Sequence, residues 1–259
     1  MFTYASLLGI AHRNNMTPVI QEGIRLTRIF NIRAGKTDNI ANTMLFHTTR
    51  EEYGKRGCAH DISLMNLDSR TNVKLLGYLQ SWKYFSEVEA EIRANYVFKD
   101  NVREKADKFF ATLPHSWQGG KVTRVGIHVR RGDMTEGYYV RYGYITAPSD
   151  YFVKAMNYYR RNYTTVCFIV CSDDIAWARE NLAGDDDVAF SVANSEAVDL
   201  AILSSCDHSI ISVGSFGWWA AWLANGTTIY YNNWPRRSTQ LEYQVEKRDY
   251  FPPHWIPME

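Results

Sequence analysis

The sequence feature that most constrains the fold is an uninterrupted apolar run at residues 166–171, Val-Cys-Phe-Ile-Val-Cys. A half-exposed strand alternates apolar and polar residues, whereas a parallel strand covered on both faces is apolar throughout. Directly after the run, Ser172-Asp173-Asp174 predicts the cap of a helix that continues to Leu182. The run therefore predicts a parallel strand that is covered on both faces.

Strands and helices alternate on both sides of this run. Residues 122–129 are predicted to form a strand with Val125, Ile127 and Val129 on one side, and a helix is predicted to begin at residues 148–150. The later elements are predicted as a helix at 195–205, a strand at 208–213, a helix at 216–224 and a strand at 228–231. This order predicts an α/β fold with a doubly wound parallel sheet, whose ligands bind beyond the carboxyl ends of the strands.

The first half of the chain, to about Phe110, mixes helices with short strands. Residues 2–11 are predicted to form an amphipathic helix, and the spacing of Val88 and Ile92 indicates another helix over 86–95. A boundary is indicated where a proline is followed by a glycine pair, in Leu113-Pro114-His115-Ser116-Trp117-Gln118-Gly119-Gly120. We therefore predict two domains, at 1–118 and 119–259.

Composition and charge exclude several classes of protein. Hydrophobic residues make up 46% and charged residues 22%, as in globular proteins, and a formal net charge of +1 provides no general attraction for nucleic acid or an anionic membrane. The chain has no apolar run of the roughly 18 residues that span a bilayer, and its first residues do not read as a signal peptide. Three glycosylation sequons, which alone say little about secretion, begin at Asn15, Asn162 and Asn225.

The four cysteines do not form a disulfide or zinc framework. On a strand, Cys167 and Cys171 share a face but lie about 13 Å apart, which is too far for a disulfide. No paired spacing suggests zinc. We expect both to be buried apolar side chains.

The first candidate anion site is the segment Val125-Gly126-Ile127-His128-Val129-Arg130-Arg131-Gly132-Asp133. Strand alternation places His128 and Arg130 on one face and Arg131 on the other. Two adjacent guanidinium groups at the end of a strand repel each other unless each meets an anion, and guanidinium grips phosphate oxygens with two parallel bonds. The alternative is that one arginine pairs with Asp133 while the other is exposed.

The second candidate is a segment in which a buried strand runs into Gly214 and Ser215 and a helix begins, Ile210-Ile211-Ser212-Val213-Gly214-Ser215-Phe216-Gly217-Trp218-Trp219-Ala220-Ala221-Trp222-Leu223. The start of that helix offers free backbone N–H groups, the positive end of the helix dipole and a hydroxyl. It could cradle a phosphate, or Ser215 could simply cap the helix. Trp218, Trp219 and Trp222 are three and four residues apart, so we expect at least two of them in the core rather than in a sugar-binding surface.

The third candidate is Asp199, a carboxylate in the otherwise apolar helix Ala197-Val198-Asp199-Leu200-Ala201. Burial of an unpaired carboxylate is costly, so Asp199 needs a partner. Either a guanine base, with two donors on one edge, or a nearby Lys or Arg meets this need. A rival site is Asp185-Asp186-Asp187, whose Asp-x-Asp spacing holds a divalent metal in some glycosyltransferases. Its place after a helix favours a solvated turn.

Taken together, these segments resemble the galactoside alpha-1,2-fucosyltransferase family, glycosyltransferase family 11, over nearly the whole chain. The resemblance rests on four motifs in order: Gly77-Tyr78-Leu79-Gln80-Ser81-Trp82-Lys83-Tyr84-Phe85, His128-Val129-Arg130-Arg131-Gly132-Asp133, Phe168-Ile169-Val170-Cys171-Ser172-Asp173-Asp174 with Trp177 and Glu180-Asn181, and Gly214-Ser215-Phe216-Gly217-Trp218-Trp219-Ala220-Ala221-Trp222-Leu223.

The resemblance implies a GT-B-like α/β fold of two Rossmann-like domains, with an acceptor-side domain at 1–118 and a GDP-fucose-binding domain at 119–259. It implies an inverting, metal-independent transfer of L-fucose from GDP-fucose to O2 of a terminal β-galactose on a glycan, with no cofactor. Roles are carried over from the distantly similar alpha-1,6- and protein O-fucosyltransferases. By this resemblance Arg130 contacts the diphosphate, Asp199 contacts guanine, and Ser215 and Phe216 contact phosphate. His128 and Arg131 are also expected among the residues that bind the donor.

The resemblance also implies a cellular setting. Family members carry a Gly-Asn-Gln loop immediately before the helix that begins here at Met1-Phe2. We therefore expect an N-terminally truncated form of a Golgi membrane protein with a lumenal catalytic domain, attached only through a signal anchor that this chain lacks.

For catalysis, Arg130 is expected to neutralise the charge that grows on the departing β-phosphate, aided by the helix start at Ser215. Asp133 and Glu136 are the nearest candidates for a base that takes the proton of the acceptor hydroxyl. The Tyr- and Gly-rich segment 137–144 forms either a mobile acceptor-side loop that stacks on galactose or a surface loop that packs its own tyrosines. Two alternatives stay open: a protein O-fucosyltransferase, or a non-catalytic protein that binds GDP-sugars or glycans.

Overall fold

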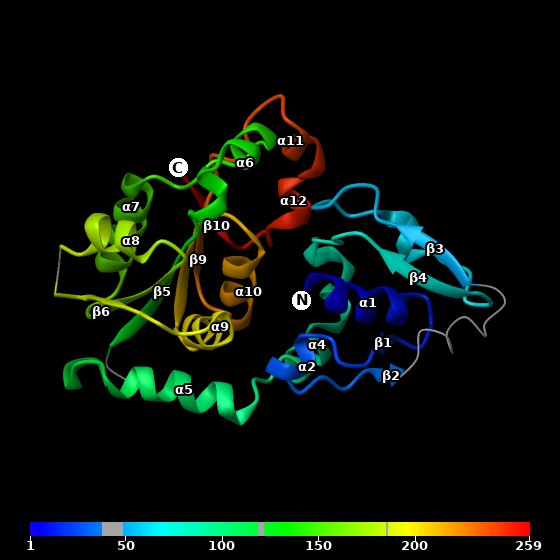
Figure 1. Ribbon diagram of the computed structural model, residues 1–259, viewed down its shortest axis with the longest axis horizontal. Coiled ribbons are helices and arrows are strands. Elements are labelled where there is room, and N and C mark those ends of the chain that lie inside the picture. The colour runs from blue at the N-terminus through cyan, green and yellow to red at the C-terminus, as the bar shows by residue number, and fades with distance from the viewer. Residues whose placement is uncertain (38–48, 119–121, 185) are drawn as a thin grey trace. The chain divides into compact units, whose positions relative to one another are not determined.

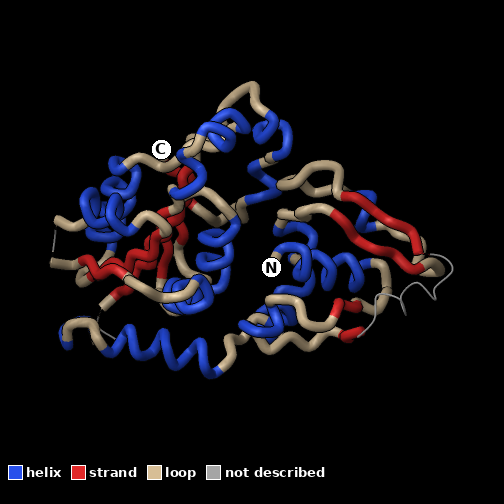
Figure 2. Tube along the Cα trace, viewed as in Figure 1, coloured by secondary structure: helices blue, strands red, loops and turns tan. Residues whose placement is uncertain are grey.

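The computed structural model describes residues 1–37, 49–118, 122–184 and 186–259. The chain divides into two compact units, one comprising Met1–Lys99 and Glu242–Pro253 and the other Asp100–Leu241 and His254–Glu259. The helices and strands of each unit are labelled in Figure 1 and coloured by type in Figure 2.

The second unit is built on a six-stranded sheet in the order β10-β9-β8-β5-β6-β7, in which every neighbouring pair is parallel. Its strands are β5 (Thr123–Val129), β6 (Val166–Ser172), β7 (Val188–Phe190), β8 (His208–Ile211), β9 (Thr228–Tyr231) and β10 (Ile256–Met258). The strands predicted at 122–129, 166–171, 208–213 and 228–231 are thereby confirmed, with ends that differ by up to two residues.

Helices cover both faces of this sheet, as the apolar run at β6 requires (Figure 1). The helices α7 and α8 pack on one face, α9 and α10 pack on the other, and α5 lies against α9. Their bounds are α5 (Asp100–Ala111), α7 (Ser149–Asn162), α8 (Ile175–Leu182), α9 (Glu196–Ser204) and α10 (Ser215–Ala224). The predicted α/β fold with a doubly wound parallel sheet is confirmed.

The strand order reverses between β5 and β8. The chain enters the sheet at β5, continues outward through β6 and β7, and then returns to β8 on the other side of β5 before reaching β9 and β10. In an open parallel sheet, loops leave such a reversal point in opposite directions, and the crevice between them is where ligands bind. The fold therefore directs attention to the carboxyl ends of β5 and β8.

The core of the second unit contains the residues that the sequence placed there. Four consecutive residues of β6, from Cys167 to Val170, are 0% exposed, so the strand is covered on both sides. Trp218, Trp219 and Trp222 of α10 are all buried, which confirms that they belong to the core. All four cysteines are buried and free, as expected for small apolar side chains.

The two units divide earlier in the chain than the glycine pair suggested. The sequence analysis placed the boundary at 118/119, whereas the second unit begins at Asp100. The reason is packing: α5 lies on α9, and the guanidinium carbon of Arg124 in β5 lies 5.0 Å from the ring centroid of Phe110 in α5. The 3-10 helix at His115–Trp117 and the described part of the linker follow α5 in this unit.

The first unit is assembled around α1 (Phe2–Arg13). The predicted helix over 2–11 is therefore present, and eight of its residues are buried, including Phe2, Tyr4 and Ser6, so most of its surface is covered. Its neighbours are short 3-10 helices at Ile62–Met65, Trp82–Tyr84 and Ser86–Val88. The last of these leads into α4 (Glu89–Asn95), so the helix predicted at 86–95 has a 3-10 first turn.

The described strands of the first unit form two parallel pairs. The pairs are β1 (Val19–Gln21) with β2 (Gly35–Thr37), and β3 (Thr49–Tyr53) with β4 (Asn72–Leu76). A short helix, α2 (Leu26–Ile29), lies between β1 and β2 in the chain.

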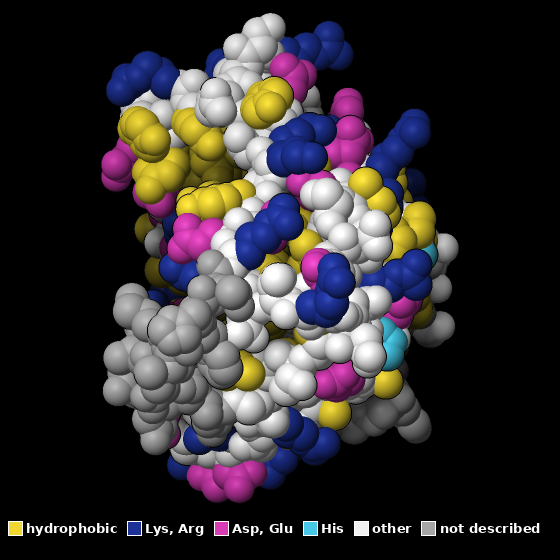
Figure 3. Space-filling model, turned by 90° about the vertical axis from the view of Figure 1, so that its right-hand side faces the viewer, with side chains coloured by type: hydrophobic (Ala, Val, Ile, Leu, Met, Phe, Trp, Pro, Cys, Tyr) yellow, Lys and Arg dark blue, Asp and Glu magenta, His cyan; other side chains and the backbone are white. Residues whose placement is uncertain are grey.

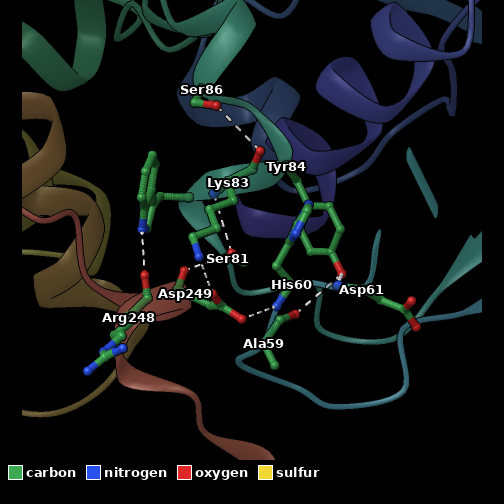
Figure 4. A network of polar contacts seen from close by, with 10 residues as sticks. Ala59, His60, Asp61, Ser81, Lys83, Tyr84, Ser86, Arg248 and Asp249 are labelled. Atoms are coloured by element: carbon green, nitrogen blue, oxygen red, sulfur yellow. Dashed lines mark hydrogen bonds and ion pairs between the residues drawn. The ribbon is translucent and has the colours of Figure 1, made fainter. Parts of the chain in front are cut away.

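Near its end the chain returns to the first unit and is fastened there by polar contacts (Figure 4). Asp249 of α12 (Lys247–Tyr250) accepts a hydrogen bond from the Lys83 ammonium at 2.5 Å and from the backbone N–H of His60 at 2.8 Å. The hydroxyl of Ser81 donates to the carbonyl of Asp249 at 2.7 Å. The short helix α11 (Gln240–Gln244) precedes this segment.

Within residues 1–37, 49–118, 122–184 and 186–259, no helix combines the length and apolar character needed to cross a bilayer. On the face shown in Figure 3, basic and acidic side chains are interspersed, in keeping with the formal net charge of +1. An anion would therefore have to be bound by a local arrangement of groups.

Candidate functional site

Four polar side chains follow four neighbouring strands at the carboxyl edge of the large sheet. Arg130 follows β5, Asp173 follows β6, Ser191 follows β7 and Ser212 follows β8. Because all these strands are parallel, their carboxyl ends lie at the same edge. Arg130, which was predicted to bind an anion, thus shares one edge of the second unit with three polar residues that were not predicted as site residues.

The ends of β5 and β8 are joined by hydrogen bonds at the point where the strand order reverses. The backbone N–H of Arg130 donates to the hydroxyl of Ser212 at 2.8 Å, and the N–H of Ser212 donates to the carbonyl of His128 at 3.1 Å. Ser212 is buried. The two segments that the sequence analysis singled out separately, at 128–133 and 213–217, therefore meet through Ser212, which it did not identify.

The guanidinium group of Arg130 lies between two carboxylates. Its NH1 donates to Oδ2 of Asp173 and its NH2 donates to Oδ1 of Asp133. The Arg130 side chain is 32% exposed, so it remains accessible to an anion. The predicted alternative of a pair with Asp133 is therefore present, but it accounts for only part of the arrangement, because Asp173 also holds this arginine.

Arg131 has different partners from Arg130. Its guanidinium carbon lies 4.0 Å from the centroid of the Trp177 ring, and its Nε lies 3.4 Å from Oδ2 of Asp174. Only 19% of the side chain is exposed. A cation over the face of a tryptophan is stabilised by the ring's quadrupole. Both partners of Arg131 therefore belong to one segment, since Trp177 is in α8 and Asp174 is its N-cap residue.

The first turn of α10 has no side-chain cap. The N-cap residue is Gly214, at φ +97°, and Ser215 is the first residue of the helix. This corrects the alternative in which Ser215 caps the helix, because a glycine with positive φ occupies the cap position. The first-turn N–H groups lack a capping side chain, Gly214, Ser215 and Phe216 are partly exposed, and the dipole end is positive.

His128 lies beneath this helix start as an uncharged ring. It is 6% exposed, and its ring centroid lies 5.2 Å from that of Phe216. Burial, and secondly the charge of Arg130, lower the pKa of His128 to about 3. An imidazole that is neutral at pH 7 offers no positive charge to a phosphate, and its ring packs against Phe216 and the α10 backbone at Gly217.

Asp199, in the first turn of α9, is held by neutral donors. The hydroxyl of Ser191 donates to its Oδ1 at 2.6 Å, and burial raises the pKa of Asp199 above its ordinary value. Within the described residues, no Lys or Arg forms an ion pair with this carboxylate. The alternative of an internal salt bridge is therefore wrong for the described part of the chain, and the carboxylate keeps acceptor capacity for a ligand.

The segment after Asp133 is helical. Glu136 is exposed and precedes α6 (Gly137–Tyr142), so it occupies the N-cap position without a capping hydrogen bond. The rings of Tyr138 and Tyr142 are stacked at 6.2 Å, and those of Tyr142 and Tyr144 at 6.1 Å. The predicted mobile loop is therefore wrong: residues 137–142 form a helix, and the tyrosines pack on one another.

The Asp-x-Asp segment falls partly outside the described residues, because Asp185 is among those left out. Asp187 accepts two hydrogen bonds from the guanidinium of Arg160, both at 2.8 Å. This carboxylate is thus part of a bidentate ion pair that ties α7 to the start of β7. Within the described residues, no group of three His, Cys, Asp or Glu side chains could hold a metal ion.

Sequence reasoning identified the arginines, Asp199 and the α10 start, and it missed three supporting residues. Asp173 was placed in a helix cap and in a family motif, Ser212 was part of the second candidate segment without a role of its own, and Ser191 was not singled out. Their position directly after a strand, shared with Arg130, was the available signal.

Comparison of the sequence with models of known protein families identifies a match. The model of Glycosyl transferase family 11 matches residues 64–259. Galactoside alpha-(1,2)-fucosyltransferase 1 of Saimiri boliviensis boliviensis is 34% identical over 189 residues, which cover 71% of this chain and 52% of that protein. Galactoside 2-alpha-L-fucosyltransferase SEC1 of Bos taurus is 34% identical over 188 residues, with 71% and 51% covered. The chain thus spans about half the length of the curated relatives it matches.

Among solved structures, the alpha-1,6-fucosyltransferase NodZ co-crystallized with GDP matches with a TM-score of 0.58 and 15% sequence identity, covering 90% of each chain. At this identity the similarity concerns the fold. It agrees with the GT-B-like α/β architecture expected from the sequence.

Proposed function

The chain belongs to glycosyl transferase family 11, and on that premise we propose that it transfers L-fucose from GDP-fucose to O2 of a terminal β-galactose on a glycan. The observation that carries the proposal is the convergence of Arg130 and the uncapped start of α10 at the strand-order reversal. A cation beside free backbone amides is an arrangement suited to a diphosphate.

In this proposal the donor lies along the carboxyl edge of the sheet. Arg130 contacts the β-phosphate, and the amides at Ser215 and Phe216 contact the phosphate oxygens. Asp199 accepts hydrogen bonds from the two donors on the edge of guanine, which suits a carboxylate that has no cationic partner among the described residues. Arg131 and His128 support this site from the α8 side and from beneath α10, respectively.

The proposed chemistry is an inverting displacement without a metal ion. Negative charge grows on the β-phosphate as the sugar departs, and Arg130 together with the helix dipole of α10 stabilises that charge. Asp133 and Glu136 are the candidate bases for the acceptor hydroxyl. Asp133 already accepts a hydrogen bond from Arg130, whereas Glu136 is exposed.

The relatives are galactoside fucosyltransferases of animals, and we extend their setting to this protein as part of the proposal. The acceptor is a β-galactoside glycan, and the place of action is the Golgi lumen.

The test combines donor binding with product analysis. The purified protein is titrated with GDP and UDP in a calorimeter and is then incubated with GDP-fucose and a panel of lactose, other β-galactosides and a folded protein domain. We expect preferential binding of GDP and fucosylation of the β-galactosides at O2, established by NMR of the product. Arg130→Ala should abolish both transfer and measurable GDP binding.

Each other outcome contradicts a defined part of the proposal. Fucosylation of the folded domain alone would identify a protein O-fucosyltransferase. GDP-fucose binding without transfer or donor hydrolysis would identify a binding protein. Unchanged GDP affinity in Arg130→Ala would remove the phosphate role of this arginine.

A further inference from the structure

Ser191 is held in place where β7 ends and the loop to α9 begins. It is 5% exposed, and its backbone N–H donates to the carbonyl of Val170 in β6 at 2.8 Å. Its hydroxyl donates to Oδ1 of Asp199 at 2.6 Å. The residue therefore connects the carboxyl edge of the sheet to the one carboxylate in the apolar part of α9.

A third residue joins this pair. Asn194 donates from Nδ2 to Oγ of Ser191 at 2.8 Å. An ionised carboxylate can only accept, so the single hydrogen of the Ser191 hydroxyl is donated to Asp199, while the Asn194 amide occupies an acceptor site of the same hydroxyl. A carboxylate offers about four acceptor sites in all, so others remain for a ligand.

The loop that carries this pair is held in an unusual backbone conformation. Ala193, between Ser191 and Asn194 in the chain, has φ +60°. A non-glycine residue in the left-handed region is strained, and such conformations persist where the surrounding structure fixes them, often at ligand sites. Here the strained residue places the Asn194 amide against the Ser191 hydroxyl.

We propose that Ser191 and Asn194 are positioning residues that hold the Asp199 carboxylate in one orientation for the two adjacent N–H donors of a guanine base. The inference rests on the proposed function, because it takes Asp199 as the residue that contacts the base. Beyond that function, the inference explains how the Asp199 carboxylate is oriented. Neither Ser191 nor Asn194 contacts the nucleotide, and both act through this carboxylate.

A consequence of this arrangement is a defined dependence on pH. Burial raises the pKa of Asp199. The hydrogen bond from Ser191 opposes this rise, and so does the hydrogen bond from the thiol of Cys171, a titratable group in β6. Loss of the Ser191 hydroxyl therefore raises the pKa of Asp199 further. A protonated carboxyl cannot accept two hydrogen bonds from guanine in the same way, so the variant should lose GDP affinity at a higher pH than the wild type.

The experiment measures nucleotide discrimination. GDP, inosine diphosphate and UDP are titrated into wild type, Ser191→Ala and Ser195→Ala at about pH 7.5 and about pH 5.5. Inosine diphosphate lacks the exocyclic amine of guanine, so the ratio of its Kd to that of GDP reports the second donor. Ser195 is the matched control, because it is exposed and its side chain makes no capping hydrogen bond at the start of α9.

We expect Ser191→Ala to weaken GDP binding about tenfold or more at the higher pH, since a hydrogen bond to a charged group is lost. The loss should be larger at the lower pH, and the preference for GDP over inosine diphosphate should fall. Ser195→Ala should match the wild type. Asn194→Ala leaves the buried serine intact and should change GDP affinity and the preference over inosine diphosphate in the same direction by a smaller factor. This variant tests the proposal if Ser191→Ala does not fold.

The outcomes separate this inference from the function on which it rests. A wild-type protein that does not prefer GDP to UDP contradicts the proposed function. A wild-type protein that prefers GDP, while both variants keep its GDP-to-inosine-diphosphate ratio and its pH profile, overturns the positioning role alone.

Discussion

Asp173 braces Arg130 from the neighbouring strand: its Oδ2 accepts from the guanidinium, and its Oδ1 accepts from the backbone N–H of Arg131 at 2.9 Å. One carboxylate after β6 thus fixes both the side chain that is proposed to meet the diphosphate and the backbone that carries it. A Cβ at position 132 would collide with Oδ2 of Asp173, so the glycine at this position permits the contact between Asp173 and Arg130.

Asp173→Ala should weaken GDP binding about tenfold or more, because Arg130 loses a charge-assisted hydrogen bond that orients it. Calorimetry with GDP measures the effect. Asp186→Ala, at an exposed turn, is the control and should bind GDP like the wild type. Tighter binding in Asp173→Ala would contradict this view, since it would mean that the carboxylate competes with the phosphate for Arg130.

The two candidate bases should be separable by steady-state kinetics. Asp133 is bonded to Arg130, so Asp133→Asn is expected to act chiefly on the KM for GDP-fucose. Glu136 is exposed, so Glu136→Gln is expected to lower kcat by about 100-fold if it takes the acceptor proton, with little change in GDP affinity. The reverse pattern would assign the base to Asp133, and unchanged kcat in both variants would mean that neither carboxylate is the base.

Gly217 should be intolerant of even a methyl group. A Cβ at this position would lie 2.9 Å from Cγ of His128, whose buried ring cannot move away easily. Gly217→Ala should lower the free energy of unfolding by roughly 1–3 kcal/mol through overpacking and should weaken GDP binding by displacing the start of α10. Urea denaturation and calorimetry measure the two effects.

Two further variants make this prediction specific. Gly184→Ala is the control, because a Cβ there meets no described atom within 4 Å. A double variant with His128→Ala should recover part of the stability that Gly217→Ala loses, since the clashing ring is gone. A double variant in which the two losses simply add would show that the clash is not the cause.

The fold of the second unit was predictable because its signals are local. The apolar run at β6, the cap before α8 and the alternation along β5 each specify one element, and the rules for parallel sheets then bring Arg130 and Ser215 to one edge. The first unit was harder to predict because its strands are short and its helices are partly 3-10. The burial of α1 on nearly all sides depends on distant segments that no local pattern specifies.

The contacts within the site were less predictable than its location. The pairing of Arg130 with Asp173 joins residues that are 43 positions apart, and it depends on the register of β5 against β6. Likewise, the Tyr-rich segment has a loop-like composition, yet residues 137–142 form a helix whose rings pack on one another. Patterns in a single sequence predict where a side chain lies along a strand, but they do not predict which residue of another strand it contacts.

The buried His128 should make the protein sensitive to mild acid. Burial, and secondly the charge of Arg130, lower its pKa from the ordinary 6.5 to about 3 in the folded state, so below pH 6.5 the unfolded chain binds a proton that the folded chain does not. The stabilising effect is complete above pH 6.5 and is lost progressively as the pH falls toward 3. Between pH 7 and pH 5 the loss should be about 2 kcal/mol.

Urea denaturation of the wild type and of His128→Phe at both pH values measures this effect. The variant should lose less stability on acidification, by about 2 kcal/mol. A residual slope is expected in both proteins, because burial also lowers the pKa of His60 and of His208. Equal slopes in the two proteins would show that His128 can be protonated in the folded state.

The final prediction concerns metal ions. In the proposed mechanism, Arg130 and the α10 start take the place of the cation that metal-dependent transferases hold on the diphosphate, so transfer should proceed at the same rate in EDTA as in Mn²⁺. Asp187, half of the Asp-x-Asp pair, is occupied by the bidentate contact with Arg160. Asp187→Ala should therefore reduce stability by roughly 1–3 kcal/mol, because Arg160 loses its partner, while leaving the response to EDTA unchanged. If transfer instead required Mn²⁺ strictly, and Asp187→Ala removed that requirement together with activity, the charge on the leaving diphosphate would be carried by a metal and not by Arg130.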